Sequence, residues 1–426
     1  MFRFRIIFGW IVCVVLIASP LLCAEMTQFS GETMGTQWNA SVVTPKPLSD
    51  EEKEEAQNAV ERALKGVDFR MSTWQNFTEL SRLNQSNESE NKISTELAKV
   101  LRAALAISQK TDGAYDITSG ALVNLWKFGP TREDQTLPDF PSDDEIAQAK
   151  KKVDFRSLDI IENSDGDLII KRQLPGVYID LSSIAKGYGA DCAADGLREL
   201  GYSNFMVEVG GEVVARGTNL WGEPWRLGIE KPVPGATSLY GAVELNDCAL
   251  ATSGDYRNFR MNADKRLSHI VDPRTGRPTE HTLVSVSVLA DSCMAADGWA
   301  TALMVLGPEE GQKIAKRENI SALFLVQNGD KIESHAVNFP LVPLDRLEAR
   351  APSANASGSR LVAQILVSVL VFCLCFVAIG YSHFTGRRKM LCSCRAAKVM
   401  EKEREQLIRS IRNIEESEDD TKHFRS

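Results

Sequence analysis

The sequence predicts an α+β fold, because strand-like and helix-like segments alternate without the regular βαβ order of a parallel sheet. Short apolar runs bounded by glycine, proline and polar turns are typical of strands. Longer stretches with apolar residues three and four apart are typical of amphipathic helices. The sequence contains neither a GxxxxGK[ST] loop nor a GxGxxG motif after a first strand. Standard nucleotide-binding loops are therefore not expected.

Individual elements follow from this periodicity and from their end signals. Strands are expected at residues 38–44, 168–172, 176–181, 205–209, 227–230, 242–245, 283–289 and 322–326. Helices are expected at residues 51–67, 96–111, 140–151, 184–200 and 294–306. The third helix begins with Pro141-Ser142-Asp143-Asp144, a helix start signal, and the last ends at Gly307. Residues 168–172 and 176–181 are expected to pair as a hairpin around Leu174-Pro175-Gly176.

The first 24 residues have the features of a signal peptide. Arg3 and Arg5 precede an apolar run that reaches Cys23 and is broken by Pro20, and cleavage after Ala24 is expected. The run is long for a signal peptide, so an uncleaved membrane anchor is the alternative. Either interpretation predicts that the following domain, residues 28–345, is exported.

A second apolar run, residues 361–381, carries no charge and is as long as a transmembrane helix requires. It follows a small, polar linker at residues 346–360, and the basic cluster Arg387-Arg388-Lys389 comes after it. Basic residues mark the cytoplasmic side of a span. The sequence thus predicts one span in the inner or plasma membrane, a catalytic domain on the extracytoplasmic side, and a cytoplasmic tail at residues 382–426.

Composition excludes some functions. The net charge is −8 and is spread along the chain, so no nucleic-acid surface is indicated. The exported region contains only three cysteines, which are expected to be buried thiols because they are too few and scattered for a disulfide framework: Cys192, Cys248 and Cys293. Four more, in the span and tail, either bind a soft metal or stay unpaired or palmitoylated: Cys373, Cys375, Cys392 and Cys394.

Three polar residues suggest chemistry. Asp297 and Thr301 are four residues apart in an expected helix and share one face, where their oxygens could hold Mg²⁺. His269, one of five histidines, could act as a base nearby. A solvated helix face, a helix cap and a structural histidine are the alternative interpretations.

Nine motifs in a fixed order give a more specific indication. They are Met34-Gly35-Thr36, residues 71–74 (MSTW) with 79–82 (ELSR), 112–116 (DGAYD), 123–129 (VNLWKFG), 180–188 (DLSSIAKGY), 209–212 (VGGE), 252–258 (TSGDYRN), 268–276 (SHIVDPRTG) and 296–301 (ADGWAT). This series resembles the ApbE family, the FAD:protein FMN transferases, over residues 30–330. The resemblance implies an ApbE-like, two-lobed catalytic domain.

The resemblance also implies a reaction and its residues. Family members split FAD at its pyrophosphate, attach the FMN half to a threonine or serine hydroxyl of a partner protein and release AMP. By position, Asp297, Thr301 and the backbone carbonyl of Ser183 match Mg²⁺ ligands, and His269 matches the proposed base. Residues matching FAD contacts are Met34, Trp74, Ala114, Tyr115, Asp116, Asp180, Lys186 and Ile270.

Two positions depart from the family pattern. Trp74 stands where tyrosine is usual, and Lys186 stands where some members have glutamate. The span, basic cluster and cysteines also resemble a small membrane maturation factor of the sodium-pumping NADH:quinone reductase. A subunit of that complex, or of a related one, is therefore the expected acceptor. An FAD pyrophosphatase and a non-catalytic FAD carrier are the alternative functions.

Overall fold

The computed structural model describes residues 24–344 and 346, apart from 131–139, 234–237, 256–258 and 263–264. The described residues belong to one compact unit. No helix within the described ranges is long and apolar enough to cross a membrane. The predicted span at 361–381 and the signal peptide up to residue 23 lie outside these ranges.

An antiparallel sheet of eight strands forms the centre of this unit, in the order β1-β2-β6-β7-β10-β15-β16-β17. Its strands are β1 (Glu25–Thr33), β2 (Thr36–Thr44), β6 (Phe205–Val209), β7 (Glu212–Arg216), β10 (Ala249–Gly254), β15 (Leu283–Ala290), β16 (Ser321–Asn328) and β17 (Lys331–Val337). The long-range register pairs Trp38 with Val209, which joins the amino-terminal hairpin to the middle of the chain. The α+β class predicted from the sequence is confirmed.

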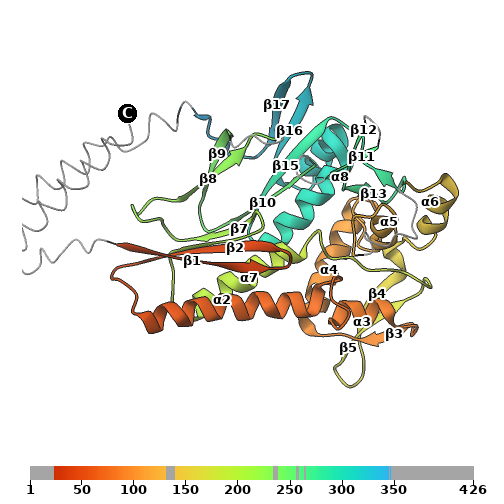
Figure 1. Ribbon diagram of the computed structural model, residues 1–426, viewed down its shortest axis with the longest axis horizontal. Helices are drawn as coiled ribbons and strands as arrows, with labels where there is room; N and C mark the ends of the chain where they lie inside the picture. Colours follow the sequence, from red (N-terminus) through yellow and green to blue (C-terminus); the bar gives the residue numbers. More distant parts are fainter. Residues whose placement is uncertain are drawn as a thin grey trace, which may run out of the picture. The chain divides into compact units, whose positions relative to one another are not determined.

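The two faces of this sheet bury different partners, because successive strand residues point to opposite sides. Val214 and Phe324 belong to the cores beneath the helices, whereas their neighbours Val213 and Leu323 belong to a core on the other face. Helices α2 (Asp50–Met71), α7 (Ala185–Glu199) and α8 (Cys293–Arg317) lie on the first face, and the hairpin β8 (Trp225–Glu230) and β9 (Leu239–Leu245) covers the second (Figure 1).

Shorter elements complete the unit. Helices α3 (Glu79–Gln85), α4 (Thr95–Lys110), α5 (Gly120–Leu125) and α6 (Asp143–Lys150) and the short helix η1 (Phe155–Ser157) join a three-stranded sheet of β3 (Glu90–Lys92), β5 (Leu168–Arg172) and β4 (Leu158–Glu162). Two small hairpins follow in the chain, β11 (Phe259–Asn262) with β12 (Lys265–Ser268) and β13 (Val271–Asp272) with β14 (Arg277–Pro278).

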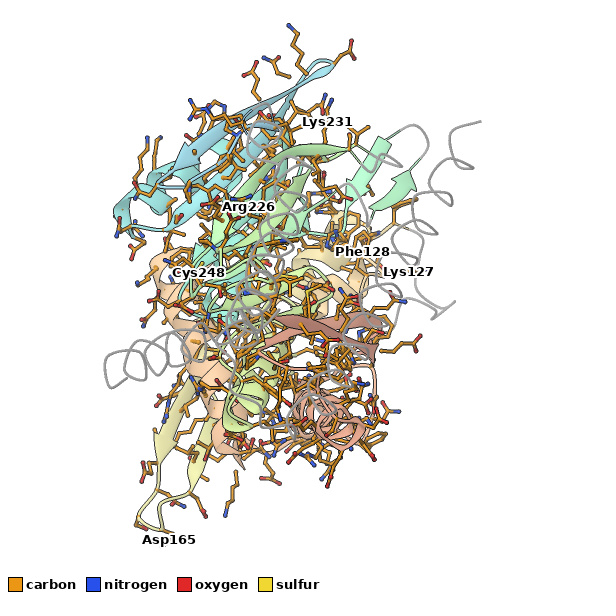
Figure 2. The ribbon with its side chains drawn as sticks, turned by 90° about the vertical axis from the view of Figure 1, so that its left-hand side faces the viewer. Lys127, Phe128, Asp165, Arg226, Lys231 and Cys248 are labelled. Atoms are coloured by element: carbon orange, nitrogen blue, oxygen red, sulfur yellow. The ribbon has the colours of Figure 1, made fainter. Side chains whose placement is uncertain are left out.

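The predicted hairpin of residues 168–172 with 176–181 is wrong. Strand β5 pairs instead with β4, through a turn in which the side-chain oxygen of Asn163 accepts the amides of Asp165 at 3.0 Å and Asp167 at 2.8 Å. Figure 2 shows Asp165 at the projecting tip of this hairpin. In the 176–181 segment, Tyr178 forms only an isolated parallel bridge with Ser119. Residues 174–176 do form a turn, but β5 pairs with β4, the strand that precedes it in the chain, and not with the segment that follows the turn.

The remaining element predictions compare well with the structure. The five predicted helices are present as α2, α4, α6, α7 and α8, and the last continues past a break at Gly307, where φ is 79°. Strands β1, β7, β10 and β17, which complete the eight-stranded sheet, were not predicted from the sequence. The cysteine prediction holds in part, since Cys192, Cys248 and Cys293 are free thiols but only Cys293 is fully buried.

Candidate active site

One pocket of about 660 Å³ collects all twelve residues that the sequence analysis singled out. They come from the β1–β2 turn, the loops after α2 and α4, the segment entering α7, the β12–β13 connection and α8: Met34, Trp74, Ala114, Tyr115, Asp116, Asp180, Ser183, Lys186, His269, Ile270, Asp297 and Thr301. The structure therefore brings them together, while the role of each one stays a prediction.

Asp297 is held by a close contact between helices α7 and α8. Its Oδ2 accepts the backbone N–H of Gly187 at 2.9 Å, and its side chain is buried. A Cβ on Gly187 would lie 2.3 Å from the carbonyl oxygen of Cys293 and 2.7 Å from Cβ of Asp297. Glycine is required at residue 187 because the two helix backbones touch there. The contact fixes the direction of the Asp297 carboxylate toward the pocket.

The carbonyl of Ser183 lies outside the hydrogen-bond ladder of α7, which begins at Ala185. The amide of Gly187 belongs to the first turn of that helix, so it has no partner within the helix. It bonds to Asp297 instead, and among the described residues no amide is recorded on the Ser183 carbonyl. The Ser183 hydroxyl donates to the phenol oxygen of Tyr115 at 2.9 Å. The carbonyl oxygen of Ser183, a residue that lines the pocket, thus remains available as a ligand for a metal ion.

Thr301 lies one helical turn after Asp297 on α8, as predicted. Its hydroxyl is 3.2 Å from the hydroxyl of Ser253 on β10, which also lines the pocket. Asp297, Thr301 and the Ser183 carbonyl provide three hard oxygen atoms, the donor type that suits Mg²⁺ and not zinc or copper. Within the described ranges no group of three or more His, Cys, Asp or Glu side chains could hold a metal. These three oxygen atoms are therefore of the kind that would hold Mg²⁺.

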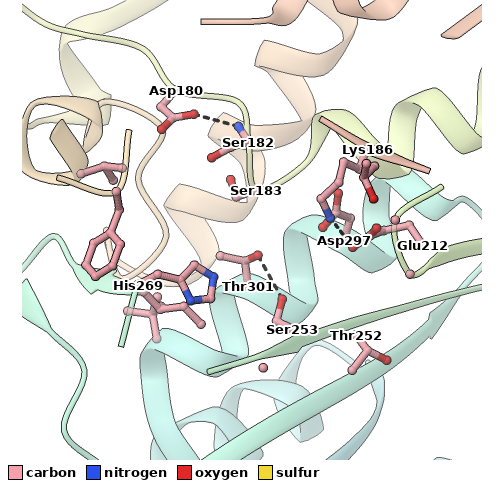
Figure 3. A pocket seen from close by; sticks show the side chains of 18 of the residues that line it. Asp180, Ser182, Ser183, Lys186, Glu212, Thr252, Ser253, His269, Asp297 and Thr301 are labelled. Atoms are coloured by element: carbon pink, nitrogen blue, oxygen red, sulfur yellow. Dashed lines mark hydrogen bonds and ion pairs between the residues drawn. The ribbon is translucent and has the colours of Figure 1, made fainter. Parts of the chain in front are cut away.

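The partly exposed Lys186 and the buried Glu212 form an ion pair beside Asp297. Lys186 Nζ bonds to Glu212 Oε1, and the other oxygen of Glu212, Oε2, is buried without a hydrogen-bond partner in the described part of the chain. Figure 3 shows the three side chains grouped together. When all three are ionised, their net charge is negative, which favours binding of a cation.

The pKa values reflect this crowding. Burial lowers the pKa of Lys186, but the charges of Asp297 and Glu212 outweigh it and hold the pKa above its ordinary range. Burial raises the pKa of Glu212, and Lys186 offsets only part of that rise. Burial also raises the pKa of Asp297, against the Lys186 charge and the Gly187 amide. Two buried carboxyls thus share one ammonium group, and an added cation would favour both ionised forms.

Two further predicted residues, Asp116 and Asp180, are buried, and both accept hydrogen bonds from backbone amides. The two oxygens of Asp116 accept the Thr118 hydroxyl at 2.6 Å and the Phe155 amide at 3.0 Å. Asp180 accepts the amide of Ser182 at 2.9 Å. Burial raises the pKa of each carboxyl. The carboxylate of Asp116 therefore shapes the loop that carries Ala114 and Tyr115 on the pocket wall.

His269 lies in a short segment that is anchored at both ends. Before it, the Ser268 hydroxyl accepts the Ile270 amide at 3.1 Å. After it, the turn between β13 and β14 is bonded to the residue that ends α5, because the indole N–H of Trp126 donates to the Gly276 carbonyl at 2.8 Å. The ring of Phe128 meets His269 edge-on, with centroids 6.3 Å apart. The imidazole faces the same pocket as Thr301 (Figure 3).

The flavin-contact candidates Met34 and Trp74 occupy exposed or strained positions. Met34 and Gly35 form the two-residue turn of the β1–β2 hairpin with φ values of 47° and 71°. Positive φ at both positions is typical of hairpin turns, but it is uncommon for methionine and is associated with functional sites. Trp74 is 54% exposed although it lines the pocket. Such a side chain is available to stack on a ligand ring.

Several residues of the pocket were not predicted from the sequence. Glu212 was part of a recognised motif, residues 209–212, yet no role was given to it because its partner Lys186 lies 26 positions earlier. Ser253 belonged to the 252–258 motif and Phe128 to the 123–129 motif, and both line the pocket. Membership of a motif was the available signal in all three cases, and only the fold shows what the side chains contact.

Hard oxygen atoms, a histidine and a basic side chain around one pocket are groups that phosphoryl-transfer enzymes use. The comparisons agree: the model of the ApbE family matches residues 34–324. The FAD:protein FMN transferase of Vibrio cholerae is 40% identical over 333 residues, covering 77% of this chain and 96% of the relative. The Escherichia coli K12 enzyme of the same name is 38% identical over 311 residues, covering 73% and 87%.

Solved structures show the same likeness. The flavin transferase ApbE from Vibrio cholerae superposes with a TM-score of 0.65 at 41% identity, covering 74% of this chain and 97% of that one. The apo form of the Pseudomonas stutzeri flavinyl transferase ApbE gives a TM-score of 0.66 at 34% identity, covering 75% and 96%. The chain belongs to the ApbE family.

Proposed function

We propose that this enzyme, an FAD:protein FMN transferase of the ApbE family, uses Mg²⁺ to transfer the FMN half of FAD to a threonine or serine hydroxyl of an acceptor protein and releases AMP. The observation that carries the proposal is the arrangement of the Ser183 carbonyl, Asp297 and Thr301 beside His269 in one pocket. The family match and the relatives' activity support the same reaction.

In this reaction the acceptor hydroxyl oxygen forms a bond to the phosphorus of the FMN half. The bond from that phosphorus to the bridging oxygen breaks, and AMP leaves with the electron pair. His269 receives the proton of the attacking hydroxyl, which general-base catalysis requires of a group within hydrogen-bond reach. A bound Mg²⁺ would neutralise the charge that develops on the phosphate oxygens.

The remaining pocket residues bind and orient FAD. Trp74 offers an exposed ring for stacking, and Lys186 provides a positive charge near the phosphates. Asp180 and the loop of residues 114–116 line the same pocket. The ordered Asp297 carboxylate needs no rearrangement before it binds a cation, since the Gly187 amide already fixes its orientation.

We extend the proposal to the location and the acceptor. Support comes from the sequence of residues 1–24 and 361–389, which predicts export and one membrane span. A catalytic unit held on the extracytoplasmic side would act on subunits of a membrane redox complex, with the sodium-pumping NADH:quinone reductase as the first candidate. Protease accessibility of the catalytic unit in oriented membrane vesicles tests the location, and cleavage only from the cytoplasmic face would contradict it.

The experiment that tests the metal site measures AMP release from FAD by the full-length chain at increasing Mg²⁺ concentrations, with acceptor protein present. Asp297→Ala is expected to lose Mg²⁺-dependent release and to keep its fold, monitored by circular dichroism. The matched control is Asp195→Ala on the exposed side of α7, which should behave as the parent. Unchanged turnover by Asp297→Ala at saturating Mg²⁺ would remove Asp297 from the metal site.

A further inference from the structure

Asp191 is a partly buried carboxylate on α7 that does not line the pocket but bonds to the first turn of α8. Its Oδ1 accepts the amide of Cys293 at 2.8 Å, and its Oδ2 accepts the amide of Met294 at 2.9 Å. The first amides of a helix have no partner within the helix, and a carboxylate also interacts favourably with the positive end of the helix dipole. Asp191 therefore bonds both oxygens to the helix that carries Asp297 and Thr301.

These bonds are in register with the contact at Gly187. Asp191 lies one turn after Gly187 on α7, and Cys293 lies one turn before Asp297 on α8. The two helices thus run in opposite directions here and are joined at two successive levels, Asp191 with Cys293 and Gly187 with Asp297. Continuing the same register by one more turn leads to residues 183 and 301.

Helix α8 also has an N-cap from its own chain segment, so Asp191 is not needed for capping alone. The Ser292 hydroxyl accepts the amide of Ala295 at 3.3 Å, so α8 already has an N-cap from its own chain segment. Such a cap stabilises the helix but cannot fix it against a neighbour. Asp191 takes the Cys293 and Met294 amides, which no other described group accepts, and it does so from α7.

We propose that Asp191 is a positioning residue that fixes α8 against α7 and thereby sets the distance from the Ser183 carbonyl to Asp297 and Thr301. The inference rests on the proposed Mg²⁺ site. Groups that orient metal ligands typically change metal affinity by about 10- to 100-fold when they are replaced. Loss of this attachment should therefore weaken Mg²⁺ binding and leave FAD binding in the absence of Mg²⁺ unchanged.

The test uses the full-length chain with Asp191→Asn, which keeps one acceptor oxygen but turns an NH₂ group toward the other amide. Two properties are measured: the rise in unfolding temperature with increasing Mg²⁺ in the presence of FAD, and FAD affinity without Mg²⁺ by flavin fluorescence. We expect the midpoint Mg²⁺ concentration to rise about tenfold. If this variant does not fold, Asp191→Glu keeps both acceptor oxygens with one extra methylene, and the same rise is expected because the helices separate.

Two controls separate positioning from simple stabilisation. Asp195→Asn changes a carboxylate on the same helix that pairs with Arg198 at 3.0 Å, and it should leave the Mg²⁺ midpoint unchanged. Ser292→Ala removes the cap within α8, and it should lower the unfolding temperature without moving the midpoint. A parental midpoint in Asp191→Asn overturns this inference alone. A parent chain without any Mg²⁺ response overturns the proposed metal site and this inference together.

Discussion

Substituting Gly187 by alanine should damage both folding and the proposed Mg²⁺ site, because α7 and α8 touch at this residue. The added methyl group would start 2.3 Å from the Cys293 carbonyl oxygen, and ordinary contact at about 3.4 Å requires a shift of about 1.1 Å. Both neighbours are backbone or Cβ atoms, so no flexible side-chain end can give way. Overpacking of this kind typically costs about 1 to 3 kcal/mol. The higher helix propensity of alanine stabilises the folded state by at most about 1 kcal/mol.

Urea denaturation of the parent, Gly187→Ala and Gly196→Ala measures this difference. Gly196 lies on the same helix, and a Cβ there would meet its nearest atom at 3.5 Å, an ordinary contact. Gly196→Ala should therefore be as stable as the parent or more stable. Gly187→Ala should be less stable and should need more Mg²⁺ for AMP release, since the displaced helix carries Asp297. Parental stability and parental Mg²⁺ dependence in Gly187→Ala would refute the close contact.

Three further predictions follow from the pocket. His269→Ala should retain FAD affinity but slow FMN transfer by about 10²- to 10⁴-fold in single-turnover assays, and a parental rate would exclude His269 as the base. Trp74→Ala should weaken FAD binding by roughly three- to tenfold in fluorescence titrations, the value of one aromatic stacking contact, whereas Trp74→Tyr should keep most of the affinity; equal affinity in all three proteins would exclude stacking. Burial raises the pKa of the Asp116 carboxyl above its ordinary 3.8, so the folded protein binds the carboxyl proton more tightly than the unfolded protein does. The contribution of Asp116 to the free energy of unfolding therefore falls as the pH rises from 3.8 to the pKa of the folded state. Asp116→Asn should lose that part of the pH dependence in denaturation curves, and an unchanged slope would contradict the assignment.

Much of the fold could be predicted from local pattern, and the exceptions have physical causes. The 3.6-residue periodicity of α2 and α4 and the capping box at Ser49 are local signals that tertiary contacts did not override. Strand pairing is different, because it depends on partners far away in sequence. Strand β5 pairs with β4 across the turn at Asn163, and the sequence of the Leu174-Pro175-Gly176 turn carries no information about this pairing.

The candidate site could be predicted in its residues but not in its connections. Asp297 and Thr301 share a helix face, so their spacing alone placed them together. The resemblance to the family identified further pocket residues by position. Two sets of contacts were not predicted. The Lys186–Glu212 pair joins residues that are 26 positions apart, and the hydrogen bonds from α8 to Asp191 join residues about 100 positions apart. Such contacts carry no periodic signal and appear only when the sheet brings α7 and α8 together.

The central claim is that this chain joins FMN covalently to a protein hydroxyl. The direct measurement is the intact mass of an acceptor domain after incubation with the full-length chain, FAD and Mg²⁺, compared with the same domain carrying alanine in place of the acceptor threonine. We predict that the threonine domain gains one FMN, that EDTA prevents the gain and that the alanine domain gains nothing. Free FMN and AMP with no change in acceptor mass would contradict the claim and would identify the activity as FAD hydrolysis.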